Sequence, residues 1–208
     1  MKWHEFSVEE RRKVVSDICS YLKIINSTPY EEYAKKFNID TSRSWCDQIV
    51  TKINGYIAEI EQQQLLEQAL IDKIKEFVDG NKHVLEEQRI ALTYYDPHFD
   101  NFIVQDKKIV GMLDFERTEV FSIDYVLDLV KRMVDRPKKY ASAAAEQFIA
   151  PRDYADLLAW YKEFYPELFN FSDMDMRLTI YSIAQELGER IVFGNDESEG
   201  QLAALVGY

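Results

Sequence analysis

Apolar residues recur at helical spacing along most of this chain, and the pattern changes to short β-type runs only near its middle. This change predicts a helical part over residues 1–85, a central part with a loop and hairpin over 86–120, and a second helical part over 121–208. Hydrophobic residues make up 47% of the 208 residues, enough for a substantial core, and the low counts of 7 Gly and 5 Pro argue against a turn-rich all-β fold. The pattern therefore predicts an α+β domain that is mainly helical.

Start and stop signals divide the first helical part. Ser7 and Glu10 have the spacing of a capping box, in which each side chain meets the other residue's backbone N–H. Pro29 is expected at the first position of a second helix. Residues 44–78 continue the helical pattern, and the polar stretch Glu61–Gln64 is either a break or an exposed turn within it.

The second helical part contains three predicted helices and a short helical tail, at Ser122–Met133, Arg152–Tyr165, 172–194 and Glu199–Leu205. Gly194 is well placed to end the third helix, because glycine readily takes the left-handed conformation that closes many helices.

The central part begins with a short β-type run at Ile90–Tyr95. Two further β-branched runs, Phe102–Val104 and Lys108–Leu113, flank the polar stretch Gln105–Lys107, which predicts a hairpin.

Three oxygen-bearing side chains occur around this hairpin. Asn101 follows Asp96 by five residues in the loop before the hairpin, and Asp114 follows its second strand. A hairpin runs out and back, so we expect Asp114 to return to the neighbourhood of Asn101. Such a group suits phosphoryl transfer, where Mg²⁺ takes hard oxygen ligands and a further carboxylate accepts the proton of a hydroxyl.

The two segments that carry these side chains read YYDPHFDN over 94–101 and LDFE over 113–116. They resemble the aminoglycoside phosphotransferase and choline kinase family, relatives of the protein kinases, whose catalytic loop HGDxxxxN precedes a hairpin and a D-[FW]-E element. The resemblance implies the fold of a protein-kinase-like C-terminal lobe. It also implies that Asp96 is the catalytic base and that Asn101 and Asp114 are the Mg²⁺ ligands.

The same resemblance assigns supporting roles to other residues. Tyr94 stands where the family usually has His and is expected to pack behind the loop, and Tyr95 replaces the usual Gly. His98 is expected to shape the loop rather than to catalyse. Downstream, IDYVLDL resembles the family's GDPxxDLA element, which implies that Asp124 and Asp128 brace the catalytic loop.

As a function, the resemblance implies a kinase that moves the γ-phosphate of ATP or GTP to a hydroxyl of a small, cationic acceptor. Five carboxylates in the second helical part are candidate acceptor contacts that the sequence does not rank, namely Asp153, Asp156, Glu163, Glu186 and Glu189. Aminoglycosides and amino alcohols are examples of such acceptors.

The helical residues before Tyr94 contain no glycine-rich loop and no V-A-x-K strand, the features with which the N-terminal lobe of a kinase holds ATP. The chain is therefore expected to be inactive, or nearly so, as an isolated lobe, whether it is a fragment of a longer kinase or a natural lone lobe. Two alternatives remain open, a non-catalytic module derived from a kinase lobe that binds a ligand or a protein, and a purely helical scaffold.

The net charge of −12 repels phosphate backbones, so nucleic acid is not an expected partner, and it weakly favours a cationic substrate if it does more than keep the protein soluble.

Cys19 and Cys46 do not form a CxxC pair and are expected to be reduced thiols. The N-terminus does not resemble a secretory signal, and the sequence contains no run of about 18 apolar residues. A cytoplasmic protein without a membrane span is expected.

Overall fold

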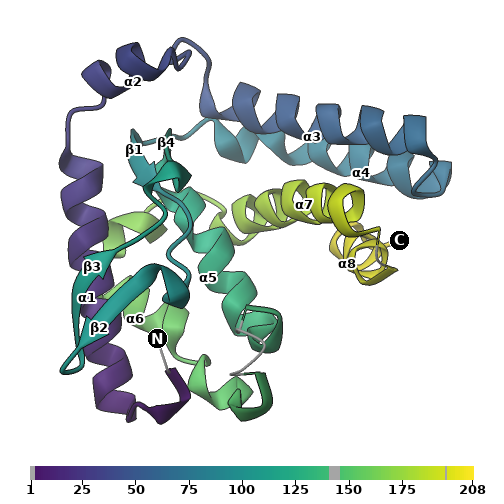
Figure 1. Cartoon of the computed structure of the whole chain (residues 1–208). Coiled ribbons are helices and arrows are strands. Elements are labelled where there is room, and N and C mark those ends of the chain that lie inside the picture. Colours follow the sequence, from purple (N-terminus) through teal and green to yellow (C-terminus); the bar gives the residue numbers. More distant parts are fainter. Residues whose placement is uncertain (1–2, 141–145, 195) are drawn as a thin grey trace. The chain divides into compact units, whose positions relative to one another are not determined.

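The computed structural model describes residues 3–140, 146–194 and 196–208, and the chain divides into two compact units (Figure 1). Unit 1 combines Met1–Ile39 with Arg89–Asn170, and unit 2 combines Asp40–Gln88 with Phe171–Tyr208. The mainly helical α+β class that the sequence predicts is confirmed.

Helix α1 of unit 1 spans Val8–Ser27. Its predicted capping box is present, because the Glu10 N–H donates to the Ser7 hydroxyl and the Ser7 N–H donates to the Glu10 carboxylate. The buried stripe of the helix includes Val14, Ile18 and Leu22. Helix α1 packs against helix α6 and strands β1 and β3, so it contacts elements of both strand pairs and a further helix of unit 1.

The predicted helix starts at Pro29 and Arg152 of unit 1 are wrong by a few residues. Helix α2 spans Glu31–Phe37, so Pro29 lies outside it. Helix α6 spans Leu157–Phe164, and the residues before it form a separate 3₁₀ turn, η8, at Pro151–Asp153. Helix boundaries are the part of a helix that local sequence signals fix least well.

The first strand pair joins β1, Ile90–Tyr94, to β4, Thr118–Ser122, in an antiparallel register that sets Leu92 opposite Val120. The sequence predicted β1 but not β4. The predicted helix start at Ser122 is wrong, because β4 and a 3₁₀ turn, η5 at Ile123–Tyr125, precede helix α5 at Val126–Asp135.

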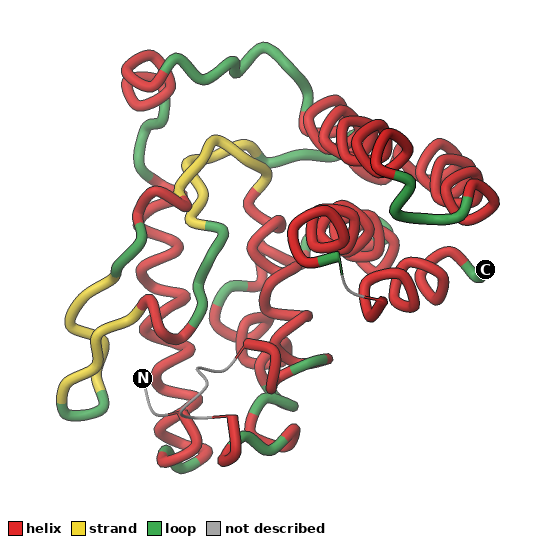
Figure 2. Tube along the Cα trace, turned by 45° about the vertical axis from the view of Figure 1, so that its right-hand side comes forward, coloured by secondary structure: helices red, strands yellow, loops and turns green. Residues whose placement is uncertain are grey.

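The second strand pair is the predicted hairpin of β2, Phe102–Gln105, and β3, Lys108–Met112 (yellow in Figure 2). Its two turn residues, Asp106 and Lys107, both have positive φ, 49° and 61°, which is the geometry of a type I′ turn. The register shifts between Ile103 and Val104, which shows a bulge in the ladder.

Unit 2 consists mainly of four helices, α3 at Trp45–Gln63, α4 at Gln68–Asn81, α7 at Met174–Phe193 and α8 at Asp196–Val206. The polar stretch after Ile60 is a true break, since Gln64 closes α3 in the left-handed conformation. Gly194 closes α7 as predicted, with φ 61°. Helix α7 packs against α3 and α8.

Polar groups are enclosed in the core of unit 2. The Trp45 indole N–H donates to the Tyr181 hydroxyl at 2.7 Å, and both rings are almost fully buried. The Arg177 guanidinium, fully buried, donates to the carbonyls of Val84 and Glu87 and lies over the ring of Phe171. Buried polar groups need such partners, so this network specifies how the helices of the unit pack.

Both cysteines are free thiols, and burial raises the pKa of Cys19 to about 12. Among the helices that the structure describes, none is both long and apolar enough to cross a membrane.

Candidate functional site

The loop between β1 and β2 brings Asp96 and Asn101 together. Residues 95–98 are irregular, and a 3₁₀ turn, η3 at Phe99–Asn101, returns the chain toward its start. The Asn101 side-chain N–H donates both to the Asp96 backbone carbonyl at 3.0 Å and to the Asp96 carboxylate at 3.3 Å. Asn101 is buried and Asp96 is half-buried, and the two hydrogen bonds fix the side chains relative to one another.

Asp114 reaches the same region through the backbone. The Leu113 N–H donates to the Asn101 carbonyl at 2.8 Å, which places Asp114 one residue beyond a direct link to the loop. Asp114 is exposed and has a left-handed backbone, with φ 56° and ψ 45°. Such strain in a residue other than glycine is frequent where function demands a particular orientation.

Tyr94 lies behind these groups and is fully buried. Its hydroxyl donates to the Leu113 carbonyl at 3.0 Å and contacts the Asn101 side chain. Burial raises the pKa of Tyr94 well above its ordinary value, and the carboxylates of Asp96, Asp114 and Glu116 raise it further.

His98 stabilises the turn of the loop. Its Nδ1 accepts a hydrogen bond from the Asp100 N–H at 3.4 Å, and its Nε2 bonds to the Tyr140 carbonyl. The Asn101 N–H in turn donates to the His98 carbonyl at 2.9 Å. His98 thus bonds both within the loop and to Tyr140, and its role in shaping the loop stays a prediction.

Asp128 connects to the loop through two residues that the sequence analysis missed. Its carboxylate accepts from the Arg132 guanidinium at 3.0 and 3.1 Å, and Arg132 also donates to the Tyr140 hydroxyl. Burial lowers the pKa of Arg132, but Asp128 and Tyr140 outweigh burial and raise it overall. Tyr140 then meets His98 through its carbonyl. The i, i+4 spacing of Asp128 and Arg132 was a visible signal, whereas nothing in the sequence marked Tyr140.

Asp124 is fully buried and accepts a hydrogen bond from the Ser122 hydroxyl. This contact secures the corner between β4 and α5. Asp124 and Asp128 therefore lie on the same connection, and the contacts from this connection to the loop at 95–101 run from Asp128 through Arg132 and Tyr140 to His98.

Arg117 is a second cation that the sequence analysis missed. Its pKa is raised, first by a hydrogen bond to the Tyr95 hydroxyl and also by the carboxylates of Asp96 and Glu116. The Tyr95 ring packs against Phe121 and Tyr125 with centroid distances of 5.4 and 5.9 Å. A guanidinium and an aromatic cluster thus adjoin Asp96.

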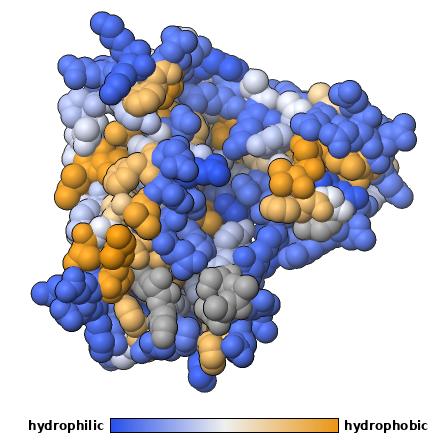
Figure 3. All heavy atoms as spheres, in the orientation of Figure 1, coloured by the Kyte–Doolittle hydropathy of each residue, from blue (hydrophilic) through white to orange (hydrophobic). Residues whose placement is uncertain are grey.

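Apolar surface lies beside this polar group. Four side chains of the hairpin and the segment after it are about half exposed, namely Ile103, Val110, Leu113 and Phe115. In the view of Figure 3, hydrophobic surface gathers over the hairpin. Pockets for small organic ligands commonly combine such apolar walls with a few polar groups.

The donor set agrees with the chemistry of Mg²⁺. Asp96, Asn101 and Asp114 offer carboxylate and amide oxygens, the hard ligands that Mg²⁺ prefers, and one or two protein ligands suffice because the ion keeps waters. Within the described residues, no group of three His, Cys, Asp or Glu side chains is arranged to enclose a metal ion.

Two of the candidate acceptor contacts are engaged elsewhere in unit 1. Asp153 pairs with Arg11 at 2.6 Å, and Glu163 pairs with Arg12. Asp156 is exposed. Glu186 and Glu189 are buried in helix α7 of unit 2.

No protein-family model matches this sequence, and no curated protein matches it either. Solved structures do match. The ADP-bound aminoglycoside phosphotransferase APH(2'')-Ib aligns with 98% of this chain at 20% identity and a TM-score of 0.62. The gentamicin complex of APH(2'')-IIa aligns with 98% of it at 18% identity and a TM-score of 0.62. The ternary complex of APH(2'')-IIa with streptomycin and ATP aligns with 99% of it at 20% identity and a TM-score of 0.61.

These matches confirm the expected fold, that of the aminoglycoside phosphotransferases. The chain spans 64–65% of the length of these structures. At identities of 18–20%, the likeness concerns the fold and leaves activity to be argued from the site.

Proposed function

We propose that the group formed by Asp96, Asn101 and Asp114 is the metal-binding and proton-accepting part of a small-molecule kinase site. The observation that carries the proposal is the pair of hydrogen bonds from the Asn101 amide to Asp96, together with the Leu113 bond to the Asn101 carbonyl. These contacts link Asp96 to Asn101 and Asn101 to Leu113, the residue before Asp114, although Asp114 follows Asp96 by eighteen positions in the sequence.

In this proposal a hydroxyl of the acceptor loses its proton to the Asp96 carboxylate as its oxygen bonds to the γ-phosphorus of ATP or GTP. The bond from that phosphorus to the bridging oxygen breaks, and the nucleoside diphosphate leaves. Asn101 orients Asp96 by holding its Oδ2. Mg²⁺, held by Asn101 and Asp114, would supply positive charge against the phosphates.

The acceptor class follows from charge. The chain carries a net charge of −12, and exposed carboxylates such as Glu116 surround the site. A cationic, hydroxyl-bearing molecule such as an aminoglycoside is favoured by this field. Gentamicin and streptomycin are bound by the solved structures named above, which supports testing that class first.

Metal binding is tested with Mn²⁺ as a paramagnetic probe for Mg²⁺. We expect Mn²⁺ to broaden the backbone amide NMR signals of Asn101 and Leu113 before others. In the Asp114→Asn variant, the same broadening should need a Mn²⁺ concentration about tenfold higher or more, because the substitution removes the charged ligand. Glu116→Gln, which removes one charge from the same surface, is the matched control and should change it little. Equal loss in both variants would mean that Mn²⁺ senses only the local charge, and the proposal would fail.

Nucleotides and cationic acceptors are then screened by thermal shift, since selective binding to the folded state raises the melting temperature. Because the sequence contains no glycine-rich phosphate loop, we expect binding but little turnover of ATP by these 208 residues alone. Robust turnover would contradict that expectation. A binding module without catalysis predicts that Asp96→Ala leaves the biological effect of the protein intact, whereas the kinase proposal predicts loss of phosphoryl transfer in an intact, two-lobed protein.

A further inference from the structure

Trp3 contacts the candidate catalytic loop directly from the N-terminal segment of the chain. It belongs to a 3₁₀ turn, η1 at Trp3–Glu5, and only 2% of its surface is exposed. Its ring stacks on that of Phe99 with centroids 4.0 Å apart and planes 27° apart. Phe99 lies within the loop, between Asp96 and Asn101, so the stack braces the very turn that brings these two residues together.

A third ring completes the support. Tyr154, which follows η8, lies 5.9 Å from Phe99 and 6.0 Å from Trp3. All three rings are buried. Burial raises the pKa of Tyr154 to about 12, with further contributions from Asp153 and from Asp100 of the loop. Offset-stacked and tilted aromatic pairs of this kind stabilise a structure beyond the area that they bury.

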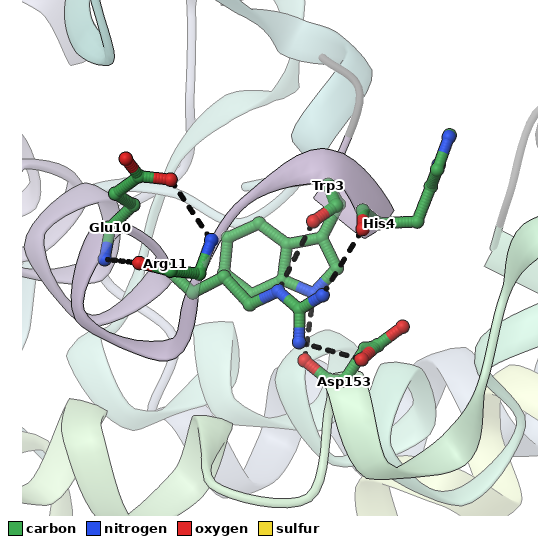
Figure 4. A network of polar contacts seen from close by, with 6 residues as sticks. Trp3, His4, Glu10, Arg11 and Asp153 are labelled. Carbon is green, nitrogen blue, oxygen red and sulfur yellow. Dashed lines mark hydrogen bonds and ion pairs between the residues drawn. The ribbon is translucent and has the colours of Figure 1, made fainter.

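Polar contacts fix the position of Trp3 itself (Figure 4). Its indole N–H donates to the Asp153 carbonyl at 2.8 Å, and its own carbonyl accepts from the Arg11 Nε at 3.1 Å. Arg11 also pairs with the Asp153 carboxylate at 2.6 Å, and the two side chains are only 9% and 11% exposed. Arg11 of α1 and Asp153 of η8 thus both bond to Trp3 and fix its position.

We infer that Trp3 is a positioning residue for the Asp96–Asn101 loop, acting through its stack on Phe99. Trp3 lies outside the segments that resemble a kinase site, and it touches none of the proposed reacting groups. Its effect on catalysis rests on the proposed function of that loop, whereas its effect on the loop's rigidity does not.

Hydrogen exchange tests the rigidity. The amides of Asn101 and Leu113 are both bonded within the site, so their exchange reports opening of the loop. We expect Trp3→Ala to speed their exchange by about tenfold or more, while amides in the buried α5 helix change less. Trp3→Phe, which keeps a stacking ring, should restore most of the protection. Phe148→Ala is the matched control, because Phe148 is exposed and stacks on the neighbouring His4 rather than on the loop.

If Trp3→Ala speeds the loop and α5 amides equally, Trp3 contributes only to general stability and the inference is overturned. Should Trp3→Ala unfold the chain, Phe99→Leu provides the same test from the other side of the stack and must show the same selective loss of protection.

Mn²⁺ broadening distinguishes the proposed function of the site from the positioning role of Trp3. We expect Trp3→Ala to reduce the broadening of the Asn101 and Leu113 signals, Trp3→Phe to restore it, and Phe148→Ala to leave it unchanged. If the wild type itself shows no broadening that depends on Asp114, the proposed function fails, and the exchange data alone decide whether Trp3 positions the loop. Loosened loop amides with unchanged broadening would refute the role of Trp3 in the site.

Discussion

Replacing Asp114 separates its role in the fold from its role in the site. The residue has φ 56° and ψ 45°, and its side chain is exposed, so a substitution loses little packing. The left-handed conformation costs an ordinary L-residue about 1–2 kcal/mol. Asp tolerates it better than Ala because its short polar side chain can hydrogen-bond locally.

Asp114→Gly should therefore be at least as stable as the wild type, and the wild type should be more stable than Asp114→Ala. Glycine relieves the strain, but it also makes the unfolded chain more flexible. That flexibility offsets about 0.4–1 kcal/mol of the gain in the free energy of unfolding. The net difference between the Gly and Ala variants should be about 0.5–1 kcal/mol in the free energy of unfolding. Both variants should lose the Mn²⁺ effect equally, because both lack the carboxylate.

Urea unfolding in a Trp45→Phe background measures the stability, since the remaining tryptophans, Trp3 and Trp160, both lie in unit 1. Asn38 is a control in the same unit, with an exposed side chain and φ 54°, ψ 42°. Its Gly and Ala variants should follow the same order of stability without affecting Mn²⁺. Equal stability of Asp114→Gly and Asp114→Ala would refute the strain argument, and Mn²⁺ broadening retained in either would refute the ligand role.

Asp128→Asn should lower the free energy of unfolding by about 3 kcal/mol or more, because it removes the carboxylate that pairs with the largely buried Arg132 guanidinium; a loss below about 1 kcal/mol, typical of exposed pairs, would contradict this in the same urea assay. Tyr181→Phe should cost unit 2 about 1–3 kcal/mol, followed by the fluorescence of Trp45, whose indole N–H loses its acceptor. The pKa of Tyr154 rises from 10.0 to about 12 on folding, so its stabilising contribution is complete below pH 10 and is lost as the pH approaches 12. Urea titrations between pH 9 and 11 should show this decline, and Tyr154→Phe should make it shallower; an unchanged slope would contradict it.

Local signals in the sequence were sufficient for much of the fold. The capping box at Ser7 and Glu10 and the hairpin around Asp106 and Lys107 are contacts between residues close in sequence, so the chemistry of a few neighbours decides them. Strand β4 was missed because it pairs with β1 more than twenty residues earlier, and its short run carries little periodicity of its own.

In the proposed site, too, some features were visible in the sequence and others depend on tertiary contacts. The spacing of Asp96, Asn101 and Asp114 and their likeness to a kinase loop were visible in the sequence, and the structure joins Asn101 to Asp96 by hydrogen bonds. The link from Asp128 through Arg132 and Tyr140 to the loop was only partly visible, because its last contact depends on where the chain after α5 passes.

Residue order by itself determined the helices, the hairpin and the identity of the polar side chains proposed for chemistry, because these depend on periodicity and on neighbours. Only the tertiary structure decided what holds the loop in place. Trp3 and Phe99 are separated by nearly half the chain, and no pattern in either segment indicates that their rings stack. Contacts of that kind depend on the packing of the whole unit, since the position of each ring follows from all the elements that surround it.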